Sequence, residues 1–228
     1  MTASRYGTTF ALWRAGCPGP WQAYTHHVFV QGLADGTLPA ASFLHYLVQD
    51  YVFLVHFARA WSLGVVKAET LDEMKVCART VDALVNHEMG LHVQTCAAAG
   101  ITEATLFAAT EEFENLAYTR YVMDAGIQGD FLDLMAALAP CCFGYGEIGQ
   151  RLAGSASLDT PYRSWIDIYA DEDYQSVMET VGQMIDAAVM RRLGSDPSKT
   201  ARWPQLQARF ATATRLEVGF WDMGLRGA

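Results

Sequence analysis

The sequence offers little support for a disulfide framework or a zinc finger. Its five cysteines stand at positions 17, 77, 96, 141 and 142, and no two of them have the C-x-x-C spacing. An odd number of cysteines without paired spacing fits neither a set of structural disulfides nor a structural zinc site. We therefore expect reduced thiols.

Positive charge is scarce as well. The chain has 16 Lys and Arg against 25 Asp and Glu, a net charge of −9, and no basic cluster beyond short pairs such as Arg191-Arg192. This balance opposes binding to a nucleic-acid backbone. The first residues lack a basic region followed by an apolar run, and the apolar stretches, such as 134–143, are too short to span a bilayer. We expect a cytoplasmic protein without a nucleic-acid or membrane partner.

Sustained alternation with period two is missing, whereas apolar residues recur every three or four positions over most of the chain. Short turn signals separate these segments, as between antiparallel neighbours in a bundle. The predicted helices span 5–15, 20–34, 39–66, 70–99, 102–125, 129–153, 160–170, 173–192 and 199–226. The sequence thus predicts an all-α fold, and a length of 228 residues fits a single domain over 1–228.

Two carboxylates fall on helix faces that are otherwise apolar. Asp50 lies on the stripe of helix 39–66, and Glu217 lies on the stripe of helix 199–226. Burying a carboxylate is unfavourable unless it is paired, hydrogen-bonded or protonated. Each acid could accept one hydrogen bond and only fix the packing. Two such acids, together with a thiol and several tyrosines, favour a site inside the bundle.

A cysteine pair follows Pro140 inside a predicted apolar helix. Cys141 and Tyr145 are four residues apart and share a helix face, whereas Cys142 points about 100° away. A buried free cysteine often serves only as a small hydrophobe, so the spacing leaves packing and reactivity both open. The tyrosines of the inward stripes could stack against a flat heteroaromatic ligand and orient it through their hydroxyls.

Other patterns carry weaker signals. Glu88 and His92 have the i,i+4 spacing of half a helical metal site, but the matching half is missing, because the acidic run 111–114 resembles a solvated first turn. The spacing of Glu147 and Arg151 predicts an i,i+4 ion pair at the surface or at the rim of the site. Phosphate-loop and Ser/His/Asp patterns are not present. We expect no metal and no cofactor.

Several short segments, in order along the chain, carry a family resemblance. They are Gly36-Thr37-Leu38-Pro39, Gln49-Asp50-Tyr51, Glu88 to His92, Ala117-Tyr118-Thr119, Pro140-Cys141 through Tyr145-x-Glu147-Ile148-Gly149, Tyr162 to Tyr169, and Leu216-Glu217-x-x-Phe220-Trp221-Asp222-Met223. Over nearly its full length the chain resembles the TenA family, thiaminase II or aminopyrimidine aminohydrolase. The resemblance implies a haem-oxygenase-like helical bundle, usually tetrameric, without haem or metal.

The resemblance also implies roles for three residues. Cys141 matches the nucleophile that adds to a ring carbon of the aminopyrimidine. Glu217 matches the residue that shuttles protons as acid and base, and Asp50 matches the carboxylate that holds the pyrimidine edge. A thiolate nucleophile and two carboxylates with separated proton affinities suit this chemistry.

Four aromatic residues complete the implied substrate-binding pocket. Tyr145 and Tyr169 match residues that line it and hydrogen-bond the substrate, and Tyr118 matches an aromatic wall. At Phe53 many family members carry a tyrosine whose hydroxyl assists the cysteine, so this hydroxyl is missing here. The pair 143–144 also differs from the bulkier aromatic residues common in the family.

The implied reaction replaces the substituent on the exocyclic methylene of the pyrimidine by hydroxyl. It releases ammonia from 4-amino-5-aminomethyl-2-methylpyrimidine, or the thiazole from thiamine. The sequence thus predicts a cysteine-dependent hydrolase of thiamin salvage with a small-molecule pyrimidine substrate. Because Phe53 lacks the hydroxyl, a pyrimidine-binding or regulatory protein with little turnover is an alternative. A metal- or cofactor-dependent oxidase on a related bundle is a third.

Overall fold

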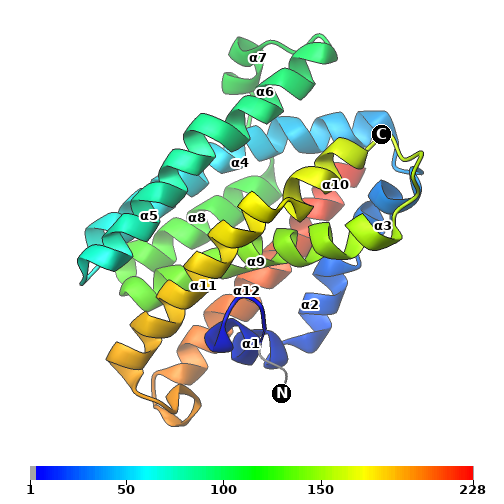
Figure 1. The fold of residues 1–228 in the computed structure, drawn as a ribbon. Helices are drawn as coiled ribbons and strands as arrows, with labels where there is room; N and C mark the ends of the chain where they lie inside the picture. The colour runs from blue at the N-terminus through cyan, green and yellow to red at the C-terminus, as the bar shows by residue number, and fades with distance from the viewer. Residues whose placement is uncertain (1–3, 228) are drawn as a thin grey trace.

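The computed structural model describes residues 4–227, with the backbone alone at Leu91, and within this range every regular element is a helix (Figure 1). The longer helices are α4 (Ala40–Lys67), α5 (Leu71–Ala83), α6 (Met89–Ala98), α8 (Phe113–Gln128), α9 (Phe131–Ser155), α11 (Glu172–Leu193) and α12 (Trp203–Leu225). The shorter ones are α1 (Thr8–Ala15), α2 (Pro18–Thr25), α3 (Val28–Asp35), α7 (Glu103–Phe107), α10 (Arg163–Ala170) and the 3-10 turn Pro197–Lys199. The predicted all-α helical bundle is confirmed.

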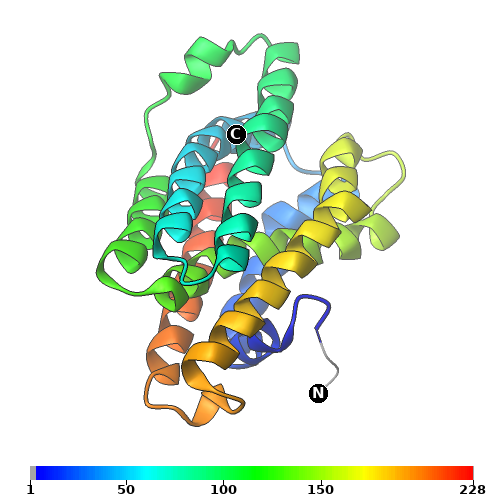
Figure 2. The same cartoon turned by 60° about the vertical axis from the view of Figure 1, so that its left-hand side comes forward.

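Helix α9 forms the centre of the bundle. It begins with a capping box, in which Asp130 accepts from the backbone of Asp133 and the Asp133 side chain accepts from the backbone of Asp130. α12, α10, α8, α11 and α4 pack around it (Figures 1 and 2). By length and composition α9 could cross a membrane, but 89% of its most apolar window is buried inside the protein. Its apolar character is therefore that of a core helix.

Two predicted helices are interrupted. The segment predicted as 20–34 divides into α2 and α3, because the His27 side chain accepts a hydrogen bond from the backbone N–H of Phe29 and starts a new helix. The segment predicted as 102–125 divides into α7 and α8. There the Gln49 side chain binds the Thr110 carbonyl and the Glu112 N–H, so bonds to α4 replace intrahelical ones.

The predicted helix 70–99 is continuous but irregular. Thr70 and Glu73 form a capping box at the start of α5, and a π-helical turn, Leu84–Glu88, joins α5 to α6. A π turn inserts an extra residue and rotates the side chains that follow it, and such turns are frequent at functional sites. This turn delivers Glu88 to the interior.

A close approach between α9 and α10 fixes the position of Tyr169. A Cβ atom at Gly149 would lie 2.5 Å from the carbonyl carbon of Tyr169, so only glycine permits this packing. The ring of Tyr169 consequently lies 4.9 Å from that of Tyr145, centroid to centroid.

The predicted ion pair between Glu147 and Arg151 is wrong. Glu147 does not pair with Arg151: it binds Arg14 and accepts from the indole N–H of Trp21, while Arg151 donates to the Thr25 carbonyl. Helices α1 and α2 cover this part of α9 and supply the partners of Glu147 and Arg151.

The acidic run 111–114 is not simply solvated, because its members form ion pairs. Glu111 binds Arg120, with 2.7 Å between nitrogen and oxygen, and Glu112 and Glu114 both bind Arg226. These pairs connect the start of α8 to its own second turn and to the end of α12.

Candidate active site

A narrow cavity of about 30 Å³ lies among α4, α5, the π turn, α9, α10 and α11. Four of the predicted site residues line it, namely Asp50, Cys141, Tyr145 and Tyr169. They come from α4, α9 and α10, which are far apart in sequence. The fold thus brings the candidate nucleophile and one inward carboxylate to the same enclosed space.

Asp50 is buried and held by two donors. The Nε2 atom of His92 lies 2.6 Å from Asp50 Oδ2, and the Tyr46 hydroxyl donates to the same oxygen over 3.0 Å. Trp165 in turn donates its indole N–H to the Tyr46 hydroxyl. Among the described residues, both of these hydrogen bonds fall on Oδ2, and Asp50 lines the cavity.

His92 carries the positive charge that balances Asp50. Burial lowers the pKa of His92, but the hydrogen bond and charge of Asp50, together with Glu88, outweigh burial and raise it to about 9. Its Nδ1 lies 3.0 Å from the carbonyl oxygen of Glu88, a geometry that suits an N–H donor. The raised pKa favours the protonated imidazolium of His92 beside Asp50 at neutral pH.

Glu88 also reaches the cavity. Its Oε1 accepts a hydrogen bond of 3.0 Å from the Tyr169 hydroxyl, and burial raises the pKa of this carboxyl. Within residues 4–227 no cluster of three or more His, Cys, Asp or Glu side chains could hold a metal ion. Glu88 and His92 form hydrogen bonds here to Tyr169 and Asp50.

Glu217 lies on α12, buried beside the cavity rather than on its lining. Its Oε1 accepts a hydrogen bond of 2.8 Å from the Tyr118 hydroxyl. Burial raises the pKa of Glu217 to about 8, although the Tyr118 hydroxyl lowers it. Tyr118, expected as an aromatic wall, instead provides the hydrogen-bond donor to this acid.

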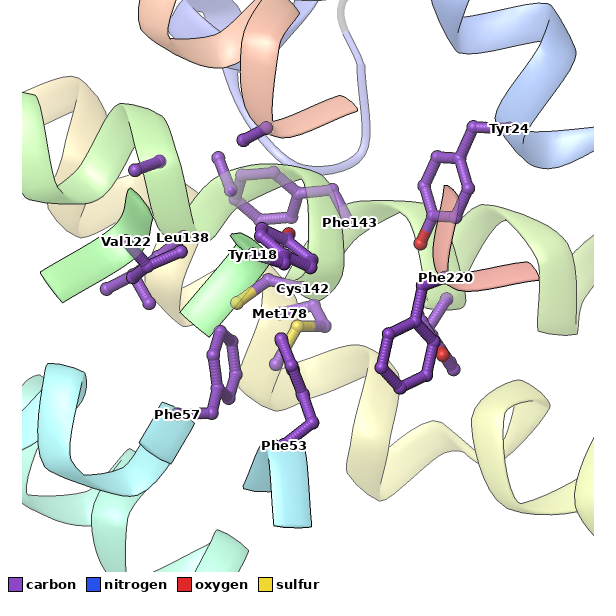
Figure 3. Close-up of a cluster of buried hydrophobic side chains, with 14 of the residues drawn as sticks. Tyr24, Phe53, Phe57, Tyr118, Val122, Leu138, Cys142, Phe143, Met178 and Phe220 are labelled. Carbon is purple, nitrogen blue, oxygen red and sulfur yellow. The ribbon is translucent and has the colours of Figure 1, made fainter. Parts of the chain in front are cut away.

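Phe53 does not line the cavity either. It packs in the layer behind, with its ring centroid 5.0 Å from that of Tyr118 and 5.3 Å from that of Phe57, which does line the cavity (Figure 3). Phe53 also meets Phe220 of α12. Direct contact between Phe53 and a ligand would need this layer to open.

The two adjacent thiols differ in their surroundings. Both side chains line the cavity, but Cys141 is only partly buried, whereas Cys142 is 3% exposed and belongs to the core cluster that includes Phe143 (Figure 3). Burial raises the pKa of the Cys141 thiol well above 9.0, and the charge of Glu217 adds to this effect. A thiolate at Cys141 therefore requires a nearby base.

A wider hollow of about 440 Å³ adjoins the cavity. Both are lined by Leu84 and Glu88 of the π turn and by Tyr174 and Met178 of α11. The hollow is mostly apolar and lies between α5 and α11.

Some of the residues that were not predicted for the site have a partial signal in the sequence. Tyr46 precedes Asp50 by four positions and so shares its helix face, and His92 follows Glu88 by four. The contact between His92 and Asp50 depends on how α6 approaches α4, which periodicity does not encode. Tyr174, whose hydroxyl donates to the Cys142 carbonyl, had no distinguishing pattern.

Comparisons with known proteins agree with this architecture. The family model described as TENA/THI-4/PQQC matches residues 18–227. An aminopyrimidine aminohydrolase of Halalkalibacterium halodurans is 35% identical over 205 residues, which are 89% of each chain. A crystal structure described as a TenA family transcription regulator from Silicibacter sp. TM1040 is 56% identical, covers 97% of this chain and 98% of its own, and has a TM-score of 0.95. The chain belongs to the TENA/THI-4/PQQC family and has its haem-oxygenase-like helical bundle.

Proposed function

We propose that the protein is a hydrolase of thiamin salvage that converts 4-amino-5-aminomethyl-2-methylpyrimidine and water into the 5-hydroxymethyl pyrimidine and ammonia. The observation that carries the proposal is the position of Cys141, which faces an enclosed cavity together with Asp50 and has the buried acid Glu217 beside it. Relatives at 35% and 30% identity, named aminopyrimidine aminohydrolases, support the substrate class.

Asp50 holds the amino edge of the pyrimidine in this proposal. The Oδ1 atom accepts a hydrogen bond from the ring amino group, while Oδ2 stays bound to His92 and Tyr46. The imidazolium balances the carboxylate charge in a buried site, where an unpaired charge is unfavourable. Tyr145 and Tyr169 flank the ring and fix its plane.

Glu217 activates the thiol. Because burial disfavours every charge in the site, the favourable route moves one negative charge instead of creating a second one. The ionised carboxylate of Glu217 takes the Cys141 proton, so the thiolate forms as the acid becomes neutral. A pKa of about 8 for Glu217 makes it a fitting partner for this exchange.

The reaction has two halves, the loss of ammonia and the addition of water. The Cys141 thiolate forms a C–S bond to a ring carbon, the exocyclic C–N bond breaks, and Glu217 returns the proton to the departing amine, which leaves as ammonia. Water next adds to the exocyclic methylene and gives its proton to Glu217. The C–S bond breaks, the ring is restored, and Cys141 regains its proton from Glu217.

The ring needs more room than the 30 Å³ cavity provides, so binding displaces side chains at the junction with the outer hollow. Met178 and Leu84 are suited to this, since both lie at the junction and Met is readily rearranged. The hollow of about 440 Å³ can hold a larger leaving group. This supports cleavage of thiamine, with release of its thiazole, as a second activity.

A regulatory role is the second candidate function. The Silicibacter relative at 56% identity is described as a transcription regulator, and Phe53 has no hydroxyl with which to assist Cys141. The two candidates differ in turnover. Purified protein mixed with the aminopyrimidine should release ammonia continuously, while a thermal shift reports binding. Binding without ammonia release would exclude the hydrolase and favour the regulator.

We also propose a homo-oligomer, tetrameric as the family resemblance implies. Phe107 and Phe113, on either side of the α7–α8 connection, are 77% and 78% exposed, which supports a partner-facing surface. Light scattering coupled to gel filtration should give a multiple of the 25.1 kDa chain. A mass equal to one chain would contradict association.

A further inference from the structure

Tyr24 of α2 occupies a position that the proposed reaction does not yet use. Its side chain is fully buried between aromatic rings, with centroids 5.6 Å from Trp21 and 6.2 Å from Trp221. Figure 3 shows its hydroxyl directed into the buried cluster, toward Phe220. Among residues 4–227 this hydroxyl has no hydrogen-bond partner.

Gly144 leaves space for the Tyr24 ring because it has no side chain. A Cβ atom at Gly144 would lie 2.1 Å from Tyr24 Cε1 and 2.5 Å from its hydroxyl oxygen, so any other residue at 144 would expel the ring. Gly144 is three residues after Cys141 and therefore lies on the same side of α9. The Tyr24 ring thus covers the turn that follows the candidate nucleophile.

The opposite side of the ring meets the helix that carries the acid. Trp221, which stacks on Tyr24, is four residues after Glu217 and shares its face of α12. The phenol is consequently wedged between the turn after Cys141 and the turn after Glu217. Burial raises the pKa of Tyr24 well above 10.0, and the next largest contributions come from the charges of these two residues. The phenol is therefore a neutral donor close to both.

A buried hydroxyl without a partner is unfavourable, so it is uncommon in a fold where nothing uses it. Phe53 contributes only an apolar ring to this region, and the Tyr118 hydroxyl is already bound to Glu217. Among the described residues, the Tyr24 hydroxyl and the Trp221 indole N–H are buried donors without a partner in this region, and the hydroxyl belongs to the ring that packs against Gly144. The unsatisfied Tyr24 hydroxyl destabilises the free protein, and a role in the reaction would explain its presence.

We propose that the Tyr24 hydroxyl donates a hydrogen bond to the negative charge that Cys141 and Glu217 exchange during the reaction. Tyr24 thereby stabilises the thiolate and the ionised acid relative to their neutral forms. The inference rests on the proposed function, because it assigns a role within the same proton exchange. It adds a residue from α2, which supplies none of the site residues described above.

The variant Tyr24→Phe removes only the hydroxyl and tests the proposal. We expect kcat to fall about 10- to 100-fold, as for the loss of a hydrogen bond to a charged group, with KM nearly unchanged. Because the free protein loses an unsatisfied group, the melting temperature should stay the same or rise. Tyr162→Phe is the matched control: its hydroxyl donates to the Leu38 carbonyl, so its loss should lower the melting temperature and leave kcat unchanged.

A second measurement is independent of turnover. In a Cys142→Ala background, the rate of alkylation of Cys141 by iodoacetamide is followed against pH, and Tyr24→Phe should shift the inflection to higher pH. Wild-type kcat and an unshifted profile in Tyr24→Phe would overturn the role of Tyr24 alone. So would a drop in melting temperature that parallels the loss of kcat, since that is a structural effect. If the wild-type protein releases no ammonia, the proposed function itself fails, whereas the alkylation profile still reports on Tyr24.

Discussion

Glu217→Gln gives the sharpest test of the buried acid, because glutamine has nearly the same shape and no charge. In the folded protein burial raises the pKa of Glu217 to about 8, against 4.5 for the ordinary side chain. The unfolded chain therefore loses this proton at a lower pH than the folded protein does. As pH rises from 4.5 to 8, the wild type should lose stability through this group, and above pH 8 the loss should level off.

The difference between 4.5 and about 8 corresponds to about 5 kcal/mol in the free energy of unfolding. Glu217→Gln lacks this dependence, so its stability relative to wild type should increase across that range. The pKa of His92, raised from 6.5 to about 9, contributes stability below pH 6.5 that is lost as pH rises through about 9. This contribution is present in both proteins and cancels in the comparison.

Urea unfolding at fixed protein concentration, followed by tryptophan fluorescence between pH 4.5 and 9, measures the difference directly. Glu69→Gln is the control, since this glutamate is exposed and pairs with Arg191 and Arg192 of α11. A stability difference between wild type and Glu217→Gln that does not change with pH would refute the reasoning. Glu217 would then ionise like an ordinary glutamate and could not exchange a proton with Cys141 near neutrality.

Three further variants test other parts of the account. His92→Asn removes the charged partner of Asp50 and should raise KM at least tenfold in steady-state kinetics; an unchanged KM would contradict the role of the pair in holding the pyrimidine. Tyr118→Phe removes the hydrogen bond that lowers the pKa of Glu217, so the pH at which the stability of the protein levels off should move upward, and a downward shift would be inconsistent with that bond. Asp133 is buried and forms ion pairs with Arg202 and Arg209. Asp133→Asn leaves both arginines without this charged partner and should lower the free energy of unfolding by about 3 kcal/mol. An unchanged free energy in urea unfolding would show that these ion pairs are dispensable.

The helices could be predicted from the sequence because each buries one apolar stripe. The same periodicity identified Asp50 and Glu217, since a carboxylate on such a stripe breaks the pattern, and both are buried in the structure. The breaks in the predicted helices at 26–27 and 108–112 could not be predicted from apolar periodicity. They depend on the side chains of His27 and Gln49, and in the second case on bonds to a distant helix.

The partners within the site were harder to predict than its acids. Tyr118 was expected as a wall, yet its position as donor to Glu217 follows from the packing of α8 against α12. His92 was considered as half of a metal site, because its spacing from Glu88 is the only local signal. Its contact with Asp50 arises between helices. Tyr24 depends on the absence of a side chain at Gly144, which gains meaning only when α2 is seen against α9.

Ammonia release by Cys141→Ala and Cys142→Ala, compared with wild type, tests the central claim most directly. The two thiols are adjacent and differ in direction, so a general effect of losing a cysteine would appear in both variants. We expect Cys141→Ala to release no ammonia while still binding the aminopyrimidine, and Cys142→Ala to retain turnover. Continued release of ammonia by Cys141→Ala would contradict the account, because the nucleophile would then not be Cys141 but another group, such as Cys142, which also lines the cavity.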